Sequence, residues 1–159
     1  MLQLAAGTGV AAAMSPLSAL SYTARTSFAS RRPALQDRKF HSTGVEAYLL
    51  NVSGRISDPE LAWLFENCYP NTLDTTVELS SFNGKPDTAV ITGDIPAMWL
   101  RDSSAQVWPY LPLLRSDEKL RQLIEGVVRR QTRCLLIDTY ANAFMPDLDA
   151  APLPWSVHD

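Results

Sequence analysis

Apolar residues recur at helical spacing in three parts of the chain. Two of these stripes follow pairs with the spacing of a capping box, Thr43 with Glu46 and Ser57 with Glu60. We therefore expect two short helices separated at Gly54 and one long helix that begins after residue 116. The three apolar faces are Val45, Tyr48, Leu49, Val52 and Ile56; Leu61, Leu64, Phe65 and Cys68; and Leu120, Leu123, Ile124, Val127, Val128, Cys134 and Leu135.

The helical period breaks over residues 71–92. Residues 75–79 and 88–92 are rich in β-branched side chains, which favour strands, and the Asn-Gly-Lys-Pro run at residues 83–86 is a turn signal. This pattern predicts a small β-hairpin. From residue 139 onward no period is visible, and the chain there has the character of a long loop.

The segment from Ile91 to Ser103 lies between this hairpin and a helix expected over residues 102–114, which prolines bend or end. It places Trp99, Arg101 and Asp102 close together. Such charges are poor core material, because burying them is costly unless they are paired or take part in chemistry. An indole offers a sugar ring an apolar face, a carboxylate accepts from hydroxyls, and a guanidinium donates through a fixed fork. The segment is therefore a candidate sugar-binding site.

Composition narrows the class of protein. The 159 residues are 46% hydrophobic and 19% charged with a net charge of −3, which suits one ordinary core and lacks the basic stripe of a nucleic-acid-binding protein. The arginine-rich residues 129–133 fall on the polar side of a helical pattern, so we expect a solvated face. Cys68 and Cys134 fit no metal spacing. Both lie on apolar stripes, which favours buried free thiols and leaves open a disulfide after export.

Residues 1–30 differ from the rest in composition. No acidic residue precedes Asp37, and residues 2–20 are rich in Ala, Gly and Ser but less apolar than a membrane span. The stretch resembles the apolar region of a twin-arginine export signal, with small residues near the end that suit cleavage. We expect residues 1–30 to be a targeting segment of an exported, periplasmic or secreted protein. A mitochondrial transit peptide is the alternative, and a cytoplasmic location also stays open.

Five blocks follow one another in order along residues 31–159. They are Arg32-Pro33 with Arg38–Ser42 and Val45-Glu46; Leu64–Asn67 with Pro70–Thr76; Ile91–Ser103; Gln106–Leu111; and Tyr140–Phe144. Together they resemble glycoside hydrolase family 125, the metal-independent exo-α-1,6-mannosidases. The resemblance implies an all-α fold, an (α/α)6 barrel of which residues 31–159 form the N-terminal part, with the small hairpin before the signature segment. Because that barrel needs a much longer chain, we expect this sequence to be a fragment.

The resemblance also implies an activity: inverting hydrolysis of α-linked mannose at non-reducing ends, with an α-mannoside oligosaccharide or glycan as substrate and no metal or cofactor. Glycosidases use two carboxylates, and Asp94 and Asp102 are a tempting pair. In the family, however, the acid and base come from later in the domain, so no catalytic residue is assigned here. The alternative is a carbohydrate-binding or helical interaction domain without catalysis. Neither reading involves nucleic acid or a membrane, and the acidic tail (Asp147, Asp149, His158 and Asp159) lacks metal-ligand spacing.

Five residues are candidates for substrate binding, each with a structural alternative. Asp102 also suits a helix N-cap, with Arg101 paired to a neighbouring carboxylate. Trp99 suits a stacking platform or a core position, and Asp94 is a typical turn residue. Asn142 suits a substrate contact or a hydrogen bond within its own loop. The resemblance favours sugar binding by Arg101 and Asp102.

Overall fold

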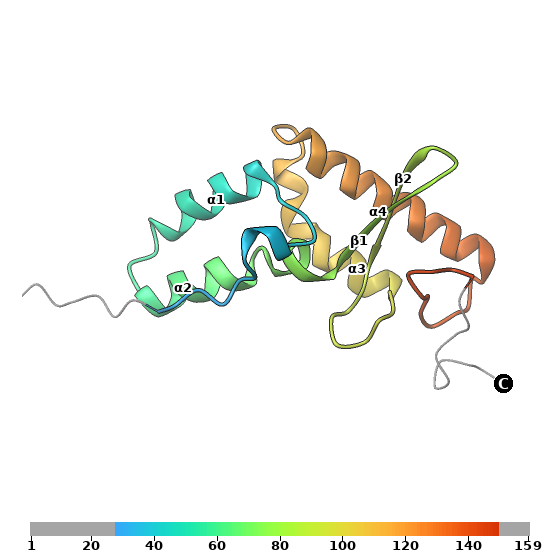
Figure 1. Ribbon diagram of the computed structural model, residues 1–159, viewed down its shortest axis with the longest axis horizontal. Coiled ribbons are helices and arrows are strands. Elements are labelled where there is room, and N and C mark those ends of the chain that lie inside the picture. The colour runs from blue at the N-terminus through green and yellow to red at the C-terminus, as the bar shows by residue number, and fades with distance from the viewer. Residues whose placement is uncertain (1–27, 150–159) are drawn as a thin grey trace, which may run out of the picture.

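The computed structural model describes residues 28–149, which form mostly helices with one two-stranded antiparallel sheet (Figure 1). Almost all of the predicted targeting segment, and the tail residues His158 and Asp159, lie outside this part. No helix within it is long and apolar enough to cross a membrane. The elements in order are η1 (Leu35–Asp37), α1 (Thr43–Ser53), α2 (Pro59–Cys68), η2 (Thr72–Thr76), β1 (Val77–Phe82), β2 (Lys85–Val90), α3 (Leu100–Val107), η3 (Trp108–Leu113) and α4 (Glu118–Ile137).

Helices α1 and α2 lie side by side at one end of the molecule, as Figure 1 shows, and their predicted caps are wrong by one residue each. Ser42, not Thr43, caps α1, and its hydroxyl accepts from the N–H of Val45 at 3.0 Å. Asp58, not Ser57, caps α2. A cap must stand just outside the helix with its oxygen on a first-turn N–H, and Thr43 is already helical.

The second predicted apolar face, on α2, is largely exposed in the part of the chain that the structure describes. Leu61 and Leu64 on α2 are exposed, and Cys68, expected to be a buried thiol, is exposed as well. Phe65 is the member of this face that packs against the core. Cys134, by contrast, is buried on α4, and both cysteines are free thiols.

The core lies where α4 crosses the hairpin and extends to α1 and η3 (Figure 1). Most of the predicted α4 stripe is buried there, although Val128 and Leu135 are exposed. Gly126 lets the helix approach β2 closely, because a Cβ at this position would lie 2.3 Å from the hydroxyl oxygen of Thr88. The buried apolar residues of the core are Val45, Leu49, Leu73, Val77, Ala89, Val90, Met98, Val107, Tyr110, Leu120, Leu123, Ile124 and Val127.

The hairpin is confirmed, with a tighter turn than the sequence pattern suggested. Asn83 and Gly84 alone form the turn, with φ of +52° and +71°, and Phe82 pairs with Lys85. Asn-Gly is the preferred pair for such a two-residue turn because both positions need positive φ. Lys85 and Pro86 therefore belong to β2 rather than to the turn.

The expectation of a solvated face over residues 129–133 is wrong for Arg130. Its side chain is buried, and its guanidinium forms an ion pair of 2.9 Å with the buried carboxylate of Asp87 on β2. The helical pattern could not show this, because the partner lies on a different element. Arg133 also reaches the Asp87 carboxylate, at 2.6 Å.

Asp117 caps α4 and ties it to the start of α1. Its carboxylate accepts from the N–H of Leu120 at 2.9 Å, from the Ser42 hydroxyl at 2.6 Å and from the N–H of Gly44 at 3.1 Å. Burial by itself would raise the pKa of the Asp117 carboxyl, but these hydrogen bonds outweigh it and hold the pKa below its usual value. The ionised carboxylate therefore stabilises the junction of the two helices.

Candidate functional site

A groove of about 490 Å³ opens between the start of α3 and the loop that follows α4. We call residues 139–149 the tail loop. Four of the five candidate residues line this groove, although they come from segments far apart in the sequence. The lining residues are Trp99, Leu100, Arg101, Asp102, Tyr140, Ala141 and Asn142.

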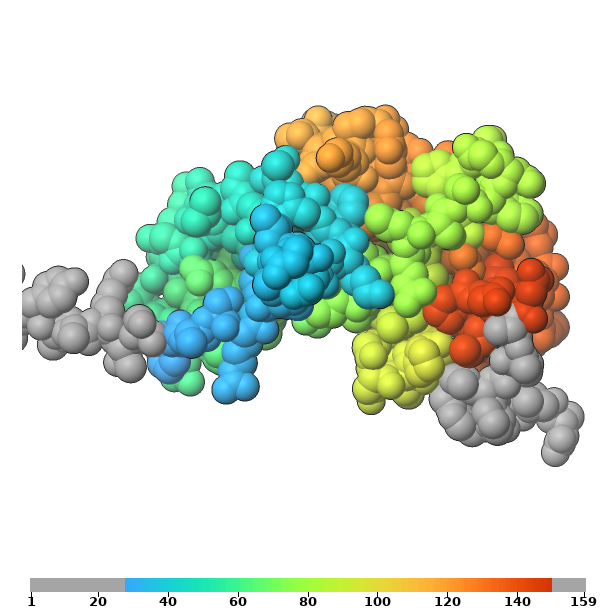
Figure 2. Space-filling view, in the orientation of Figure 1, coloured from blue at the N-terminus to red at the C-terminus, as the bar shows by residue number. Residues whose placement is uncertain are grey.

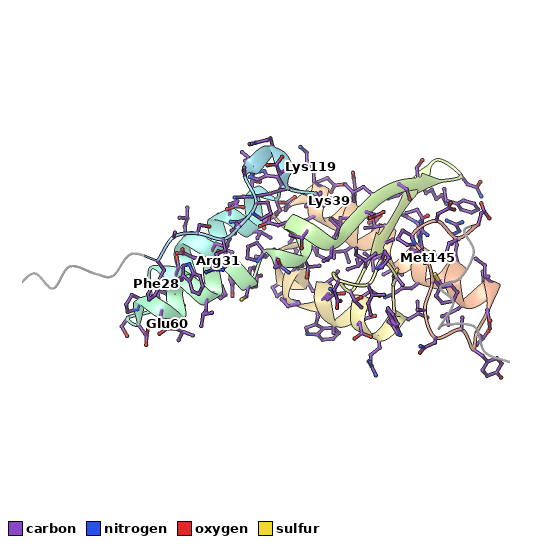
Figure 3. All side chains as sticks on the ribbon, turned by 60° about the horizontal axis from the view of Figure 1, so that its bottom comes forward. Phe28, Arg31, Lys39, Glu60, Lys119 and Met145 are labelled. Atoms are coloured by element: carbon purple, nitrogen blue, oxygen red, sulfur yellow. The ribbon has the colours of Figure 1, made fainter. Side chains whose placement is uncertain are left out.

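Backbone pairing brings the two walls of the groove together. Met98 and Phe144 form an isolated antiparallel bridge, with N–H to carbonyl distances of 2.8 and 3.0 Å. Figure 2 shows the result, since the segment around residues 93–99 lies beside the tail loop on the surface. In Figure 3 Met145 marks this end of the molecule, and Phe28 and Glu60 mark the opposite end beside α2. The bridge places Tyr140 and Asn142 opposite α3.

The other wall is held by α4. Gln131 on α4 donates to the carbonyl of Leu100 at 3.2 Å and to the hydroxyls of Ser103 and Ser104, each at 2.9 Å. Ser103 is fully buried, so this contact fixes the first turn of α3 against the core. The charged residues of that turn therefore stand on a braced helix rather than on a free loop.

Arg101 and Asp102 project from this first turn toward solvent. The Arg101 side chain is 89% exposed and that of Asp102 is 38% exposed, and they form an ion pair of 3.3 Å. Trp99 occupies the position before the helix, and no side chain caps it there. The N-cap interpretation of Asp102 is therefore wrong, because this residue lies inside α3. Both charged groups are available to a ligand in the groove.

Trp99 and Asn142 complete the polar and apolar sides of the groove. Trp99 is half-buried, so part of its ring system reaches the groove. The Asn142 side chain is exposed and forms no hydrogen bond with another described residue, which leaves its donors and acceptor to solvent or a ligand. The alternative role of Asn142 was a hydrogen bond within its own loop, and no such bond is present among residues 28–149.

Two differences from the expected site stand out. Asp94 is not among the lining residues; it is exposed in the bend after Gly93, whose φ is +127°. Tyr140 also lines the groove and is 91% exposed, and the sequence pattern did not predict this role, although Tyr140 lies two residues before Asn142 in the same block. The signal that could have identified Tyr140 is its position near the candidate Asn142 in an irregular loop.

The chemistry of the groove follows from the side chains that line it. Asp102 is the one carboxylate among its described lining residues, whereas glycoside hydrolysis uses two. Within residues 28–149, no group of three or more His, Cys, Asp or Glu lies close enough to hold a metal ion. The groove offers a hydrogen-bonding fork, a carboxylate, an amide and aromatic surface, which together match the groups of a sugar.

Comparison with known proteins decides which family carries this groove. The family described as metal-independent alpha-mannosidase (GH125) matches residues 58–156, a span that includes both walls of the groove. The chain belongs to the GH125 family. The expected family is thereby confirmed, and a glycoside hydrolase of the α-mannosidase type is the class that this membership supports.

Two similar proteins are each matched by this chain over only part of their length. This chain is 50% identical over 117 residues to the Meiotically up-regulated gene 157 protein of Schizosaccharomyces pombe. The matched residues cover 73% of this chain and 23% of that protein. The chain is 47% identical to a Streptococcus pneumoniae metal-independent α-mannosidase solved in a non-productive complex with α-1,6-mannobiose. That match has a TM-score of 0.62 and covers 69% of this chain and 25% of the solved chain. The chain thus spans about a quarter of the length of these relatives.

Proposed function

We propose that this chain contributes the sugar-binding groove of an exo-α-1,6-mannosidase that releases mannose from non-reducing ends with inversion. The observation that carries the proposal is the meeting of Trp99, Arg101, Asp102 and Asn142 in one groove. Membership of GH125 supports the reaction class. The α-1,6-mannobiose bound to the similar Streptococcus pneumoniae enzyme supports the choice of linkage.

Each group in the groove has a task in this proposal. The Asp102 carboxylate accepts hydrogen bonds from mannose hydroxyls, and the Arg101 guanidinium donates to a second pair of oxygens. The Trp99 ring covers an apolar face of the pyranose, and the Asn142 amide donates and accepts from the opposite wall. Because Gln131 anchors the first turn of α3, the backbone that carries Arg101 and Asp102 holds its position before the sugar arrives.

The two catalytic carboxylates are proposed to lie outside this chain. The groove has one carboxylate among its described lining residues, and it already serves a binding role in this proposal. In a protein of the relatives' length, which we call the extended protein, further helices would complete an (α/α)6 barrel and supply the acid and base. We propose that the chain alone does not hydrolyse mannosides.

A second candidate function is sugar binding without catalysis, favoured by the same lone carboxylate in the groove.

In either case we propose that the protein is exported, because of the composition of residues 1–30. The mass of the mature, exported protein tests that location, since removal of the targeting segment would lower it by the mass of those residues.

The test of function compares the extended protein with this chain alone. Each is given α-1,6-mannobiose and an aryl α-mannoside, and the anomer of the released mannose is followed by NMR. We expect the extended protein to release β-mannose first and the chain alone to release none. Turnover by the chain alone, or release of the α-anomer, contradicts the proposal. Binding of mannobiose without turnover by the extended protein favours the second candidate.

A further inference from the structure

A buried ion pair between Asp87 and Arg130 joins the hairpin to α4. Arg130 donates from Nε to Asp87 Oδ1 at 3.0 Å, and its Nη2 lies 2.9 Å from Asp87 Oδ2. The side chains are 6% and 3% exposed. A guanidinium that meets a carboxylate with two nitrogens is held in one orientation, because both bonds must keep their geometry. The direction of the remaining nitrogen, Nη1, is therefore fixed as well.

That remaining nitrogen reaches the tail loop. Arg130 Nη1 donates to the carbonyl oxygen of Pro146 at 2.7 Å. Together with the bridge between Met98 and Phe144, this bond attaches the tail loop to the protein just beyond Tyr140 and Asn142. Helix α4 ends at Ile137. The groove residues Tyr140 and Asn142 therefore lie in the chain between the end of this helix and the two attachments.

We propose that Asp87 and Arg130 are positioning residues of the sugar groove: their buried ion pair clamps the tail loop so that Asn142 faces Arg101 and Asp102. The proposal rests on the proposed function for its sugar. A buried ion pair on its own is weak evidence for stability, because desolvation offsets much of the attraction. The third hydrogen bond, to a loop that forms one wall of the groove, gives the pair a specific role.

Arg133 is the matched control for this role. It pairs with the same carboxylate, Asp87 Oδ2, at 2.6 Å, and its guanidinium lies over the Phe82 ring at 3.6 Å from the centroid. It donates to no residue of the tail loop among the described contacts. Replacing Arg130 or Arg133 with Met thus removes one positive charge from beside the same acid, but only Arg130→Met removes a hydrogen bond to the tail loop.

Amide hydrogen exchange in the extended protein tests the clamp without any sugar. We expect Arg130→Met to raise exchange of the Phe144 N–H, which donates to Met98, by at least about tenfold, because opening of the loop exposes this bond. Arg133→Met should leave it within about threefold of the parent protein. Equal exchange rates in Arg130→Met and the parent overturn the inference, whatever the activity. If Arg130→Met does not fold, Arg130→Lys takes its place with the same two outcomes.

Kinetics on α-1,6-mannobiose then test whether the clamp acts through the groove. We expect Arg130→Met to lower kcat/KM by about ten- to a hundredfold, since misplacement by about 1 Å has effects of this size. Most of this loss should disappear when it is measured in an Asn142→Ala background, because the residue being positioned is gone. Losses that simply multiply overturn the positioning role. Absence of hydrolysis by the parent protein contradicts the proposed function instead, and leaves hydrogen exchange to decide the clamp.

Discussion

Replacing Asp102 with Asn separates sugar binding from structural support in the groove. The structural contribution of the charge is small, because the Asp102 side chain is 38% exposed and its partner Arg101 is 89% exposed. An exposed ion pair contributes about 0.2–1 kcal/mol, and a negative charge in a first helical turn about 0.3–1 kcal/mol. Since Asn keeps the shape of the side chain, we expect the free energy of unfolding to fall by about 0.5–2 kcal/mol, the sum of these two contributions.

The expected loss of activity comes from a different interaction, the bond to the sugar. A hydrogen bond from a sugar hydroxyl to a charged acceptor is worth roughly 1.5–3 kcal/mol. If Asp102 makes this bond in the transition state, kcat/KM falls by roughly ten- to a hundredfold. Arg101→Lys should give a loss of the same kind, because Lys keeps the charge but lacks the planar fork.

The assay measures kcat/KM on α-1,6-mannobiose and the free energy of unfolding of the same preparations of the extended protein. Glu118→Gln is the matched control, since Glu118 also lies in the first turn of a helix and pairs with an exposed arginine, Arg121. We expect this control to keep its kcat/KM. An Asp102→Asn variant with kcat/KM within about threefold of the parent would refute the binding role, because so small a change is typical of a surface substitution.

Three further predictions follow from the core and the thiols. Gly126→Ala should destabilise by about 1–3 kcal/mol despite the better helix propensity of Ala, because the new Cβ meets Thr88; denaturant unfolding measures this, and a stabilised variant contradicts it. Asp117→Asn should remove stability that the parent has at neutral pH and loses as the pH falls through the lowered pKa of Asp117. Thermal unfolding from pH 7 to about pH 2 should show the two proteins converging only below the ordinary carboxyl pKa of 3.8. Burial raises the pKa of the Cys134 thiol to about 11, so a thiol reagent at pH 8 should modify Cys68 in the native protein and Cys134 only after unfolding. Rapid native modification of both would be evidence against this.

Local sequence patterns determined the elements whose signal lies within a few residues. The Asn83-Gly84 pair specified a hairpin, because two successive positive φ values favour these residue types. The apolar stripe of α4 specified a long helix and most of its buried face. The order of the sequence blocks pointed to the GH125 family, which the family comparison then confirmed.

Local patterns did not determine which helix faces are covered or the exact residue at which a helix begins. Cys68 lies on an apolar stripe yet is exposed, since helical period shows which residues share a face and not whether anything covers that face. Asp102 belongs to α3 and not to its cap, because the helix begins two residues earlier, at Leu100. Such boundaries depend on hydrogen bonds that alternate caps satisfy almost equally well.

The groove itself was decided by tertiary structure. The sequence named Trp99, Arg101, Asp102 and Asn142 as candidates from their chemistry, but only the bridge between Met98 and Phe144 brings them to one place. The helical pattern predicted a solvated Arg130, but this side chain is buried against its carboxylate partner on the hairpin, Asp87. Periodicity reports the surroundings of a residue along its own element. Burial of a charge depends instead on a partner across the fold, and local patterning does not encode that pairing.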